Sequence, residues 1–250
     1  MPGRTVAAHG DLSVADSSAL DSFLDKWRVR WPEWSVGETF VAADRRARAV
    51  AWFALQQEFE DAMNIAGETL PADAKLAWWG EELRGWSLQR SRHPLGRVLE
   101  PIRADWAGLA ETLPVLMEAR EPASSADAAY AQLQPWAEAM ARVESVVLGG
   151  APSAQLFVVQ TLAQRMIEAH VAAPPQDHTG TDAAERQRGW AVTLLRAWPA
   201  FARAAPERRL WASYALGRLQ RFVRAGGKEV ALPSRLRLLV GSWWRVVGGH

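Results

Sequence analysis

The chain has 250 residues, of which 49% are hydrophobic and 23% are charged, and its formal net charge at pH 7 is +1. This length allows one large domain or two small ones, and the composition is that of an ordinary globular protein. The absence of cysteine excludes disulfides, thiolate zinc sites and cysteine nucleophiles, and a net charge near zero without a basic binding motif argues against a nucleic-acid partner.

Residues 1–17 show no regular pattern and are expected to form a flexible N-terminal tail before one helical domain at 18–250. No apolar stretch suits a secretory signal or approaches the roughly 20 residues of a membrane span, so a cytoplasmic location is expected. Asp21 and Asp25 lie four apart in an amphipathic segment. They are interpreted as part of a solvated helix face rather than as magnesium ligands.

Clusters of proline and glycine divide the rest of the chain into segments with helical periodicity. No stretch shows the sustained alternation of β-branched residues that is typical of strands, so an all-α, single-domain fold is predicted. The fourteen tryptophans predict a core rich in indole side chains. The main predicted helices are Asp44–Asn64, Pro71–Gln89, Ser125–Leu148, Pro152–Val171 and Asp182–Arg203.

The stretch from Arg45 to Leu99 carries the most informative pattern. It reads RRARAVAWFALQQEFEDAMN, then a short Gly/Pro loop, then ADAKLAWWGEELRGW, and finally HPLGRVL. This order resembles the squalene/phytoene synthase family, the head-to-head trans-isoprenyl diphosphate synthases. In that family a helix of the form R-x-A…A-L-Y-A-F-C-R-x-x-D-D-x-x-D precedes R-L-x-W-W-x-E-x-L and H-P-x-x-x-A-L. The closest matches are Lys75, Leu76, Trp78, Trp79, Glu82, Leu83 and the His93-Pro94 pair.

The segment LDSFLDKWRVRWPEW, read from Leu20, is similar to bacterial proteins of uncertain activity that are assigned to this family. The resemblance implies an isoprenoid-synthase-like helical bundle around a central cavity. It also implies the condensation of two prenyl diphosphates, in which Mg²⁺ ions held by two Asp-rich motifs stabilise the leaving diphosphate. The rest of such a cavity is apolar and shelters a carbocation from water.

The first Asp-rich motif of the family is degenerate in this chain. Its leading aspartate corresponds to Glu60, the next to Asp61 and the closing one to Asn64, with the register open by one position. The arginine just upstream in the family corresponds to Gln57, and the tyrosine corresponds to Phe53. Glutamate can bind Mg²⁺, whereas a neutral asparagine is a poorer ligand.

The second motif is expected in AQLFVVQTLAQRMIEAHVAAPP, which contains no aspartate. Gln160, Gln164 and Glu168 follow one face of this helix, and Arg165 is adjacent. One glutamate and two amides cannot reproduce a trinuclear magnesium clamp. The candidate substrate-binding residues are therefore Phe53, Gln57, Glu60, Asp61, Asn64, Gln160, Gln164, Arg165 and Glu168, and the candidate metal ligands are Glu60, Asp61 and Glu168.

Three functions remain open on this reading. The first is a protein of isoprenoid metabolism with degraded magnesium–diphosphate chemistry that binds a prenyl chain or another lipid. The second is an active prenyl-diphosphate transferase with altered ligands, which would need Mg²⁺; the other two functions need no cofactor. The third is a non-catalytic assembly or interaction factor with a protein partner, as in the family's branch of mitochondrial respiratory complex I assembly factors. The loss of carboxylates favours the first and third functions.

The C-terminal part of the chain is strongly basic. From position 201 onward there are ten Lys/Arg and two Asp/Glu, a difference of +8. In the last segment, Leu236, Leu239, Val240 and Trp243 form one helical stripe. Two interpretations are compatible with it: peripheral contact with a membrane surface, or the last core helix of the bundle. The arginines that flank the stripe are Arg235, Arg237 and Arg245.

Overall fold

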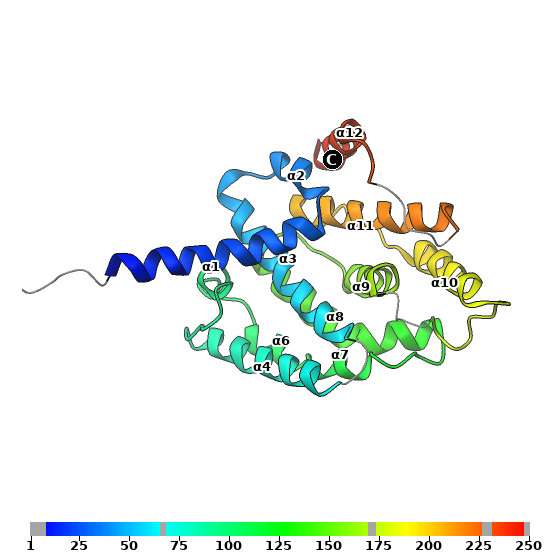
Figure 1. The fold of residues 1–250 in the computed structure, drawn as a ribbon, viewed down its shortest axis with the longest axis horizontal. Helices are drawn as coiled ribbons and strands as arrows, with labels where there is room; N and C mark the ends of the chain where they lie inside the picture. Colours follow the sequence, from blue (N-terminus) through cyan, green and yellow to red (C-terminus); the bar gives the residue numbers. More distant parts are fainter. Residues whose placement is uncertain (1–8, 66–68, 170–173, 227–231, 248–250) are drawn as a thin grey trace, which may run out of the picture.

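The predicted helices are present in the computed structural model, which describes residues 9–65, 69–169, 174–226 and 232–247. Within these residues the long helices are α1 (His9–Arg30), α3 (Ala43–Met63), α4 (Leu70–Ser87), α8 (Ala126–Val147), α9 (Ala154–Ala169), α10 (Ala183–Ala197), α11 (Pro206–Arg224) and α12 (Arg235–Val247). The short ones are α2 (Trp34–Gly37), the 3-10 turn η1 (Glu38–Phe40), α5 (Gly96–Leu99), α6 (Trp106–Ala110) and α7 (Pro114–Glu118). Figure 1 shows them as one all-α domain without a sheet in the described residues, as predicted.

Two boundaries differ by more than two residues from the sequence expectation. Helix α1 begins at His9, inside the segment expected to be a tail, whereas residues 1–8 lie outside the described part of the chain. Helix α10 ends at Ala197 rather than at Arg203. Its end is explained by Trp198, which has extended backbone angles because the proline that follows disfavours the helical conformation.

The core is rich in indole, as the composition predicted. A central group joins Trp27, Trp31 and Trp34, on and just after α1, to Phe53 of α3 and Trp211 of α11. The ring centroids of Phe53 and Trp211 are 4.4 Å apart. Such packing fixes α1 against the rest of the domain through large, rigid side chains. Ten tryptophans of the described residues are at most 3% exposed: Trp27, Trp31, Trp34, Trp52, Trp79, Trp86, Trp106, Trp136, Trp190 and Trp211.

A buried ion pair connects three helices inside this core. Arg208 of α11 donates from Nε to Glu144 of α8 at 2.9 and 2.8 Å, and both side chains are fully buried. Trp52 of α3 also donates to Glu144, at 2.6 Å, and Arg208 donates to Gln56 of α3 at 2.9 Å. The pair therefore sets the mutual positions of α3, α8 and α11 through directional contacts.

Contacts between the long helices set the arrangement of the domain. Helix α1 packs on α3, α9 packs against α8 and α11, and α12 packs against α2 and α11. In Figure 1, α12 lies at one edge of the domain and α4 and α6 lie at the opposite edge. None of the helices in the described residues is long and apolar enough to cross a membrane.

Candidate functional site

A pocket of about 690 Å³ lies between α1, α3, α9 and α11, next to the aromatic core. One part of its wall is apolar and the other carries opposite charges from all four helices. The apolar lining includes Phe23, Trp27, Val29, Ile167, Phe222 and Leu232. The charged lining consists of Lys26, Arg30, Glu58, Asp61, Glu168, Arg218 and Arg221.

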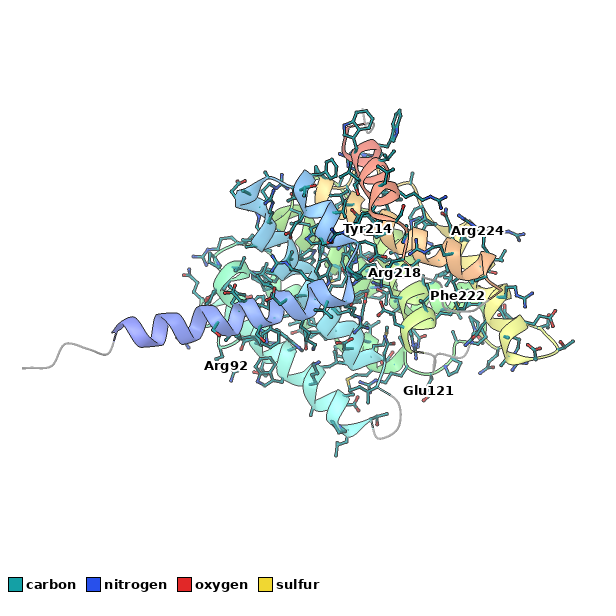
Figure 2. The ribbon with its side chains drawn as sticks, turned by 45° about the horizontal axis from the view of Figure 1, so that its top comes forward. Arg92, Glu121, Tyr214, Arg218, Phe222 and Arg224 are labelled. Carbon is teal, nitrogen blue, oxygen red and sulfur yellow. The ribbon has the colours of Figure 1, made fainter. Side chains whose placement is uncertain are left out.

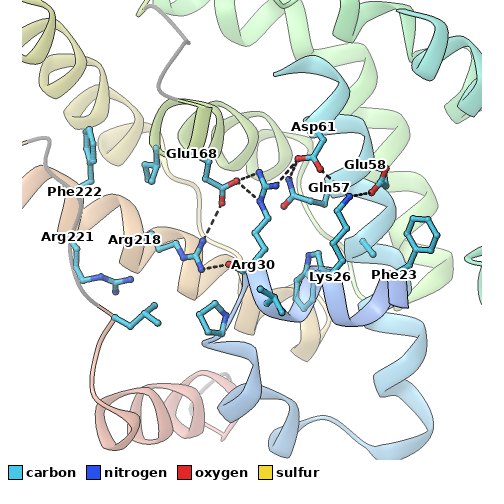
Figure 3. A pocket seen from close by; sticks show the side chains of 16 residues that line it. Phe23, Lys26, Arg30, Gln57, Glu58, Asp61, Glu168, Arg218, Arg221 and Phe222 are labelled. Carbon is cyan, nitrogen blue, oxygen red and sulfur yellow. Dashed lines mark hydrogen bonds and ion pairs between the residues drawn. The ribbon is translucent and has the colours of Figure 1, made fainter. Parts of the chain in front are cut away.

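Arg30 occupies the middle of the charged wall, as Figure 3 shows. Its guanidinium donates to Asp61 of α3 at 2.9 Å and, from Nε, to Glu168 of α9 at 2.8 Å. Burial acts to lower the pKa of Arg30, but the carboxylates of Glu168 and Asp61 outweigh it and raise the pKa. One arginine from α1 thus bridges two of the three acids on the expected Asp-rich helices, Asp61 and Glu168.

Glu58, a further acid on α3, forms ion pairs through both of its carboxylate oxygens. It accepts from Lys26 at 3.0 Å and pairs with Lys75 of α4 at 2.8 Å. Burial acts to raise the pKa of Glu58, but the bonds to Lys75 and Lys26 outweigh it and lower the pKa. Glu58 is therefore held as an ionised partner of two lysines and does not replace the missing aspartates.

The α11 side of the pocket is cationic. Arg218 is held firmly, because it donates to Glu33 at 2.9 and 2.7 Å and lies 3.8 Å over the ring of Trp31. Arg221, one turn further along, contacts Glu33 only at 3.5 Å. Burial and the neighbouring charges of Arg218 and Arg224 lower the pKa of Arg221, although Glu33 acts to raise it. An anion at this end of the pocket would relieve that repulsion.

Glu60 lies behind the charged wall and does not line the pocket. It accepts from Gln56 at 2.9 Å and from Thr161 of α9 at 2.8 Å, and a turned amide of Gln164 donates to both of its oxygens. Burial raises the pKa of Glu60 to about 7; the bonds from Gln56 and Thr161 act in the opposite direction. Glu60 and Glu168 thus lie near one another, with Glu168 in the pocket and Glu60 in the interior.

The structure separates the residues predicted from the family motifs into two groups. Gln57, Asp61 and Glu168 line the pocket, and Gln57 donates to Asp61 at 3.2 Å. The other predicted residues do not line the pocket. Phe53 is in the aromatic core, Asn64 follows the end of α3, and Gln160 and Gln164 are buried. Arg165 donates to the carbonyls of Ala119 and Arg120.

The predicted magnesium ligands do not fit a magnesium site. Glu60 is buried among neutral hydrogen-bond donors, and Asp61 and Glu168 already share the guanidinium of Arg30. Among the described residues no group of three or more His, Cys, Asp or Glu could hold a metal ion. Magnesium requires several free anionic oxygens around one point, whereas here Arg30 occupies the carboxylates of Asp61 and Glu168.

Replacing Arg30 with methionine tests this assignment. We expect the free energy of unfolding to fall by about 1–2 kcal/mol, since the two acids lose their shared cation while solvent still screens them in part. We also expect Mg²⁺ to raise the melting temperature of the variant, but not that of the unaltered protein. Arg28→Met, which removes a more exposed arginine of α1, is the matched control. An equal response of the unaltered protein to Mg²⁺ would contradict the assignment.

The sequence analysis missed the cations that define this site: Lys26, Arg30, Arg218 and Arg221. A signal was present, because Lys26 and Arg30 lie four apart and Arg218 and Arg221 three apart, so each pair shares a helix face. The pair that was considered in this region, Asp21 and Asp25, is exposed, in agreement with its interpretation as a solvated face.

No family model, curated protein or solved structure matches the chain. The resemblance to the squalene/phytoene synthase family therefore stays a prediction that depends on the residues quoted above, and the case for a function depends on the pocket itself.

Proposed function

We propose that this chain is a squalene/phytoene synthase-like protein that binds a prenyl chain or a similar lipid with an anionic headgroup, without magnesium–diphosphate chemistry. The observation that carries the proposal is Arg30, which joins Asp61 to Glu168 where the resemblance would place metal ions. A guanidinium held between two carboxylates is not a Lewis acid, so it cannot activate a leaving diphosphate as a metal ion does.

The size and lining of the pocket support a lipid of moderate length. Its volume of about 690 Å³ falls inside the range of roughly 300–1,000 Å³ that is usual for small-molecule sites. Phe23, Trp27, Ile167 and Phe222 supply the apolar contacts that an isoprenoid chain needs, and they come from three different helices. Burial of such a chain against these side chains would provide most of the affinity.

The headgroup is assigned to the α11 end of the pocket. Arg221 has the weakest acidic contact of the arginines in the charged wall, and Arg218 lies beside it on the same face. A phosphate or diphosphate there would receive charge-assisted hydrogen bonds from guanidinium groups, which suit its geometry.

The proposal is tested by calorimetric titration with farnesyl diphosphate in EDTA. We expect saturable binding, and we expect Arg221→Gln to weaken it about tenfold or more, because a charge-assisted hydrogen bond is lost. Farnesol, which lacks the headgroup, should bind both proteins with equal affinity.

The matched control is Arg84→Gln, because Arg84 lies on α4 and pairs with exposed acids outside the pocket. It should leave the affinity for farnesyl diphosphate unchanged. If neither farnesyl diphosphate nor farnesol binds to the unaltered protein, the proposed function is wrong.

A further inference from the structure

Helix α12 exposes the apolar stripe that the sequence predicted. Leu236 is 71% exposed, Trp244 is 62% exposed and Trp243 is 46% exposed, with Leu239 and Val240 between them on the same surface. In a last core helix these side chains would face the bundle. The core-helix interpretation of the stripe is therefore wrong for the described residues, and the apolar face of α12 has no partner among them.

The opposite face of α12 attaches the helix to the domain. Ser242 is buried and shares a hydrogen bond of 2.6 Å with Tyr214 of α11, and Leu238 packs against the core. Figure 2 shows α12 at the edge of the molecule, with Tyr214 close to it. The helix is thus held in an orientation that directs its leucines and tryptophans outward. This arrangement is typical of a helix that lies on a membrane surface.

The charge around this face selects an anionic partner. Arg235 and Arg237 begin α12, and residues 232–250 contain no aspartate or glutamate. Arg237 also lines a small cavity together with Arg221 of α11, so the basic ends of the two helices lie close together. The side chain of Arg245, the third predicted flanking arginine, lies outside the described residues.

We propose that α12 docks on the surface of a bilayer that contains anionic lipids, with Leu236, Leu239, Val240, Trp243 and Trp244 in the headgroup region. Tryptophan favours that region because its ring is apolar and its N–H is polar, and arginine beside it pairs with lipid phosphates. A bilayer also fits because the face is convex and belongs to one helix, whereas the groove of a protein partner would require matching shape.

The docking face adjoins the pocket. Leu232, three residues before α12, lines the pocket and is half exposed. Val29, on the pocket wall formed by α1, is also exposed. A bilayer in contact with α12 would therefore lie near these exposed apolar side chains of the pocket lining. The docking itself needs no ligand in the pocket and is tested separately from it.

The test is co-sedimentation of the full chain with vesicles, without any prenyl compound. We expect binding to phosphatidylcholine vesicles with about one third phosphatidylglycerol, and weaker binding to phosphatidylcholine alone or at high salt. Leu239→Glu with Trp243→Glu should reduce binding more than tenfold, because both side chains lose their insertion. Arg235→Gln with Arg237→Gln should reduce it about fivefold per arginine and remove most of the salt dependence.

The control variant is Leu70→Glu with Leu88→Glu, which changes two exposed leucines, one at the start of α4 and one just after its end, at the opposite edge of the domain. It should sediment like the unaltered protein. Circular dichroism shows whether each variant is folded. If the glutamate variant does not fold, the arginine variant, which changes surface charge alone, still tests the proposal. Absence of vesicle binding, equal binding to neutral vesicles, or a dimer that the α12 variants dissociate would each overturn the proposal.

Discussion

Replacement of Arg208 with methionine is expected to lower the free energy of unfolding by about 3–5 kcal/mol, the largest effect that we predict for one substitution. The cause is the carboxylate of Glu144, which is fully buried and would be left without its cationic partner. Trp52 would still donate to it, but a single neutral hydrogen bond does not replace a bidentate guanidinium. Urea unfolding followed by circular dichroism measures the change.

Two further variants separate the ion pair from general damage to the core. Arg208→Met together with Glu144→Leu should recover much of the lost stability, since no unpaired charge remains. Arg84→Met, which breaks exposed pairs with Glu81 and Glu111, should change the free energy of unfolding only slightly. If the double variant is less stable than Arg208→Met, the buried charge is not the cause.

Glu60→Gln is expected to change how stability depends on pH. Burial raises the pKa of Glu60 from its ordinary value of 4.5 to about 7. Between these values the unfolded chain releases a proton that the folded chain retains, so stability falls as pH rises from 4.5 to about 7 and is then constant. Glutamine does not titrate, and its amide can donate to Gln164. The variant should therefore lack this loss and be more stable at pH 8 by on the order of 2–3 kcal/mol.

The control for this prediction is Glu82→Gln. Glu82 is also buried, which acts to raise its pKa, but the backbone N–H groups of His93 and Arg92 and the side chains of Trp86 and Arg92 lower the pKa overall. Its contribution is lost only as pH falls below the ordinary value, so Glu82→Gln should leave the slope above pH 5 unchanged. The test is the free energy of unfolding measured between pH 5 and 8.5. The prediction for Glu60 is wrong if the stability of the Glu60→Gln variant depends on pH as steeply as that of the unaltered protein.

Local patterns predicted the helices well because their limits are set by nearby residues. Ser125 caps α8 by accepting from the backbone of Ala128, and Asp182 does the same for α10 through Glu185. The short helices α5, α6 and α7 have too few turns to show a period, so the sequence did not reveal them. The ion pair of Arg208 with Glu144 joins residues far apart in the chain, and no local pattern indicates such a contact.

The site was predicted only in part, because it too depends on contacts between residues that are far apart in the chain. Asp61 was identified from the resemblance to the family's first motif, and Glu168 from the helix in which the resemblance places the second motif; both line the pocket. Their shared partner Arg30 lies on another helix, and its role depends on how α1 packs across α3 and α9. Spacing also cannot tell which of two neighbouring acids faces the pocket: Asp61 does, whereas Glu60 points into the interior.

The most direct test of the central claim compares farnesyl diphosphate binding and turnover with Mg²⁺ and with EDTA. Because Arg30 occupies the carboxylates of Asp61 and Glu168, we predict the same saturable affinity in both conditions and no release of inorganic diphosphate. Release of diphosphate that depends on Mg²⁺, together with a condensed prenyl product, would contradict the account and support the active transferase.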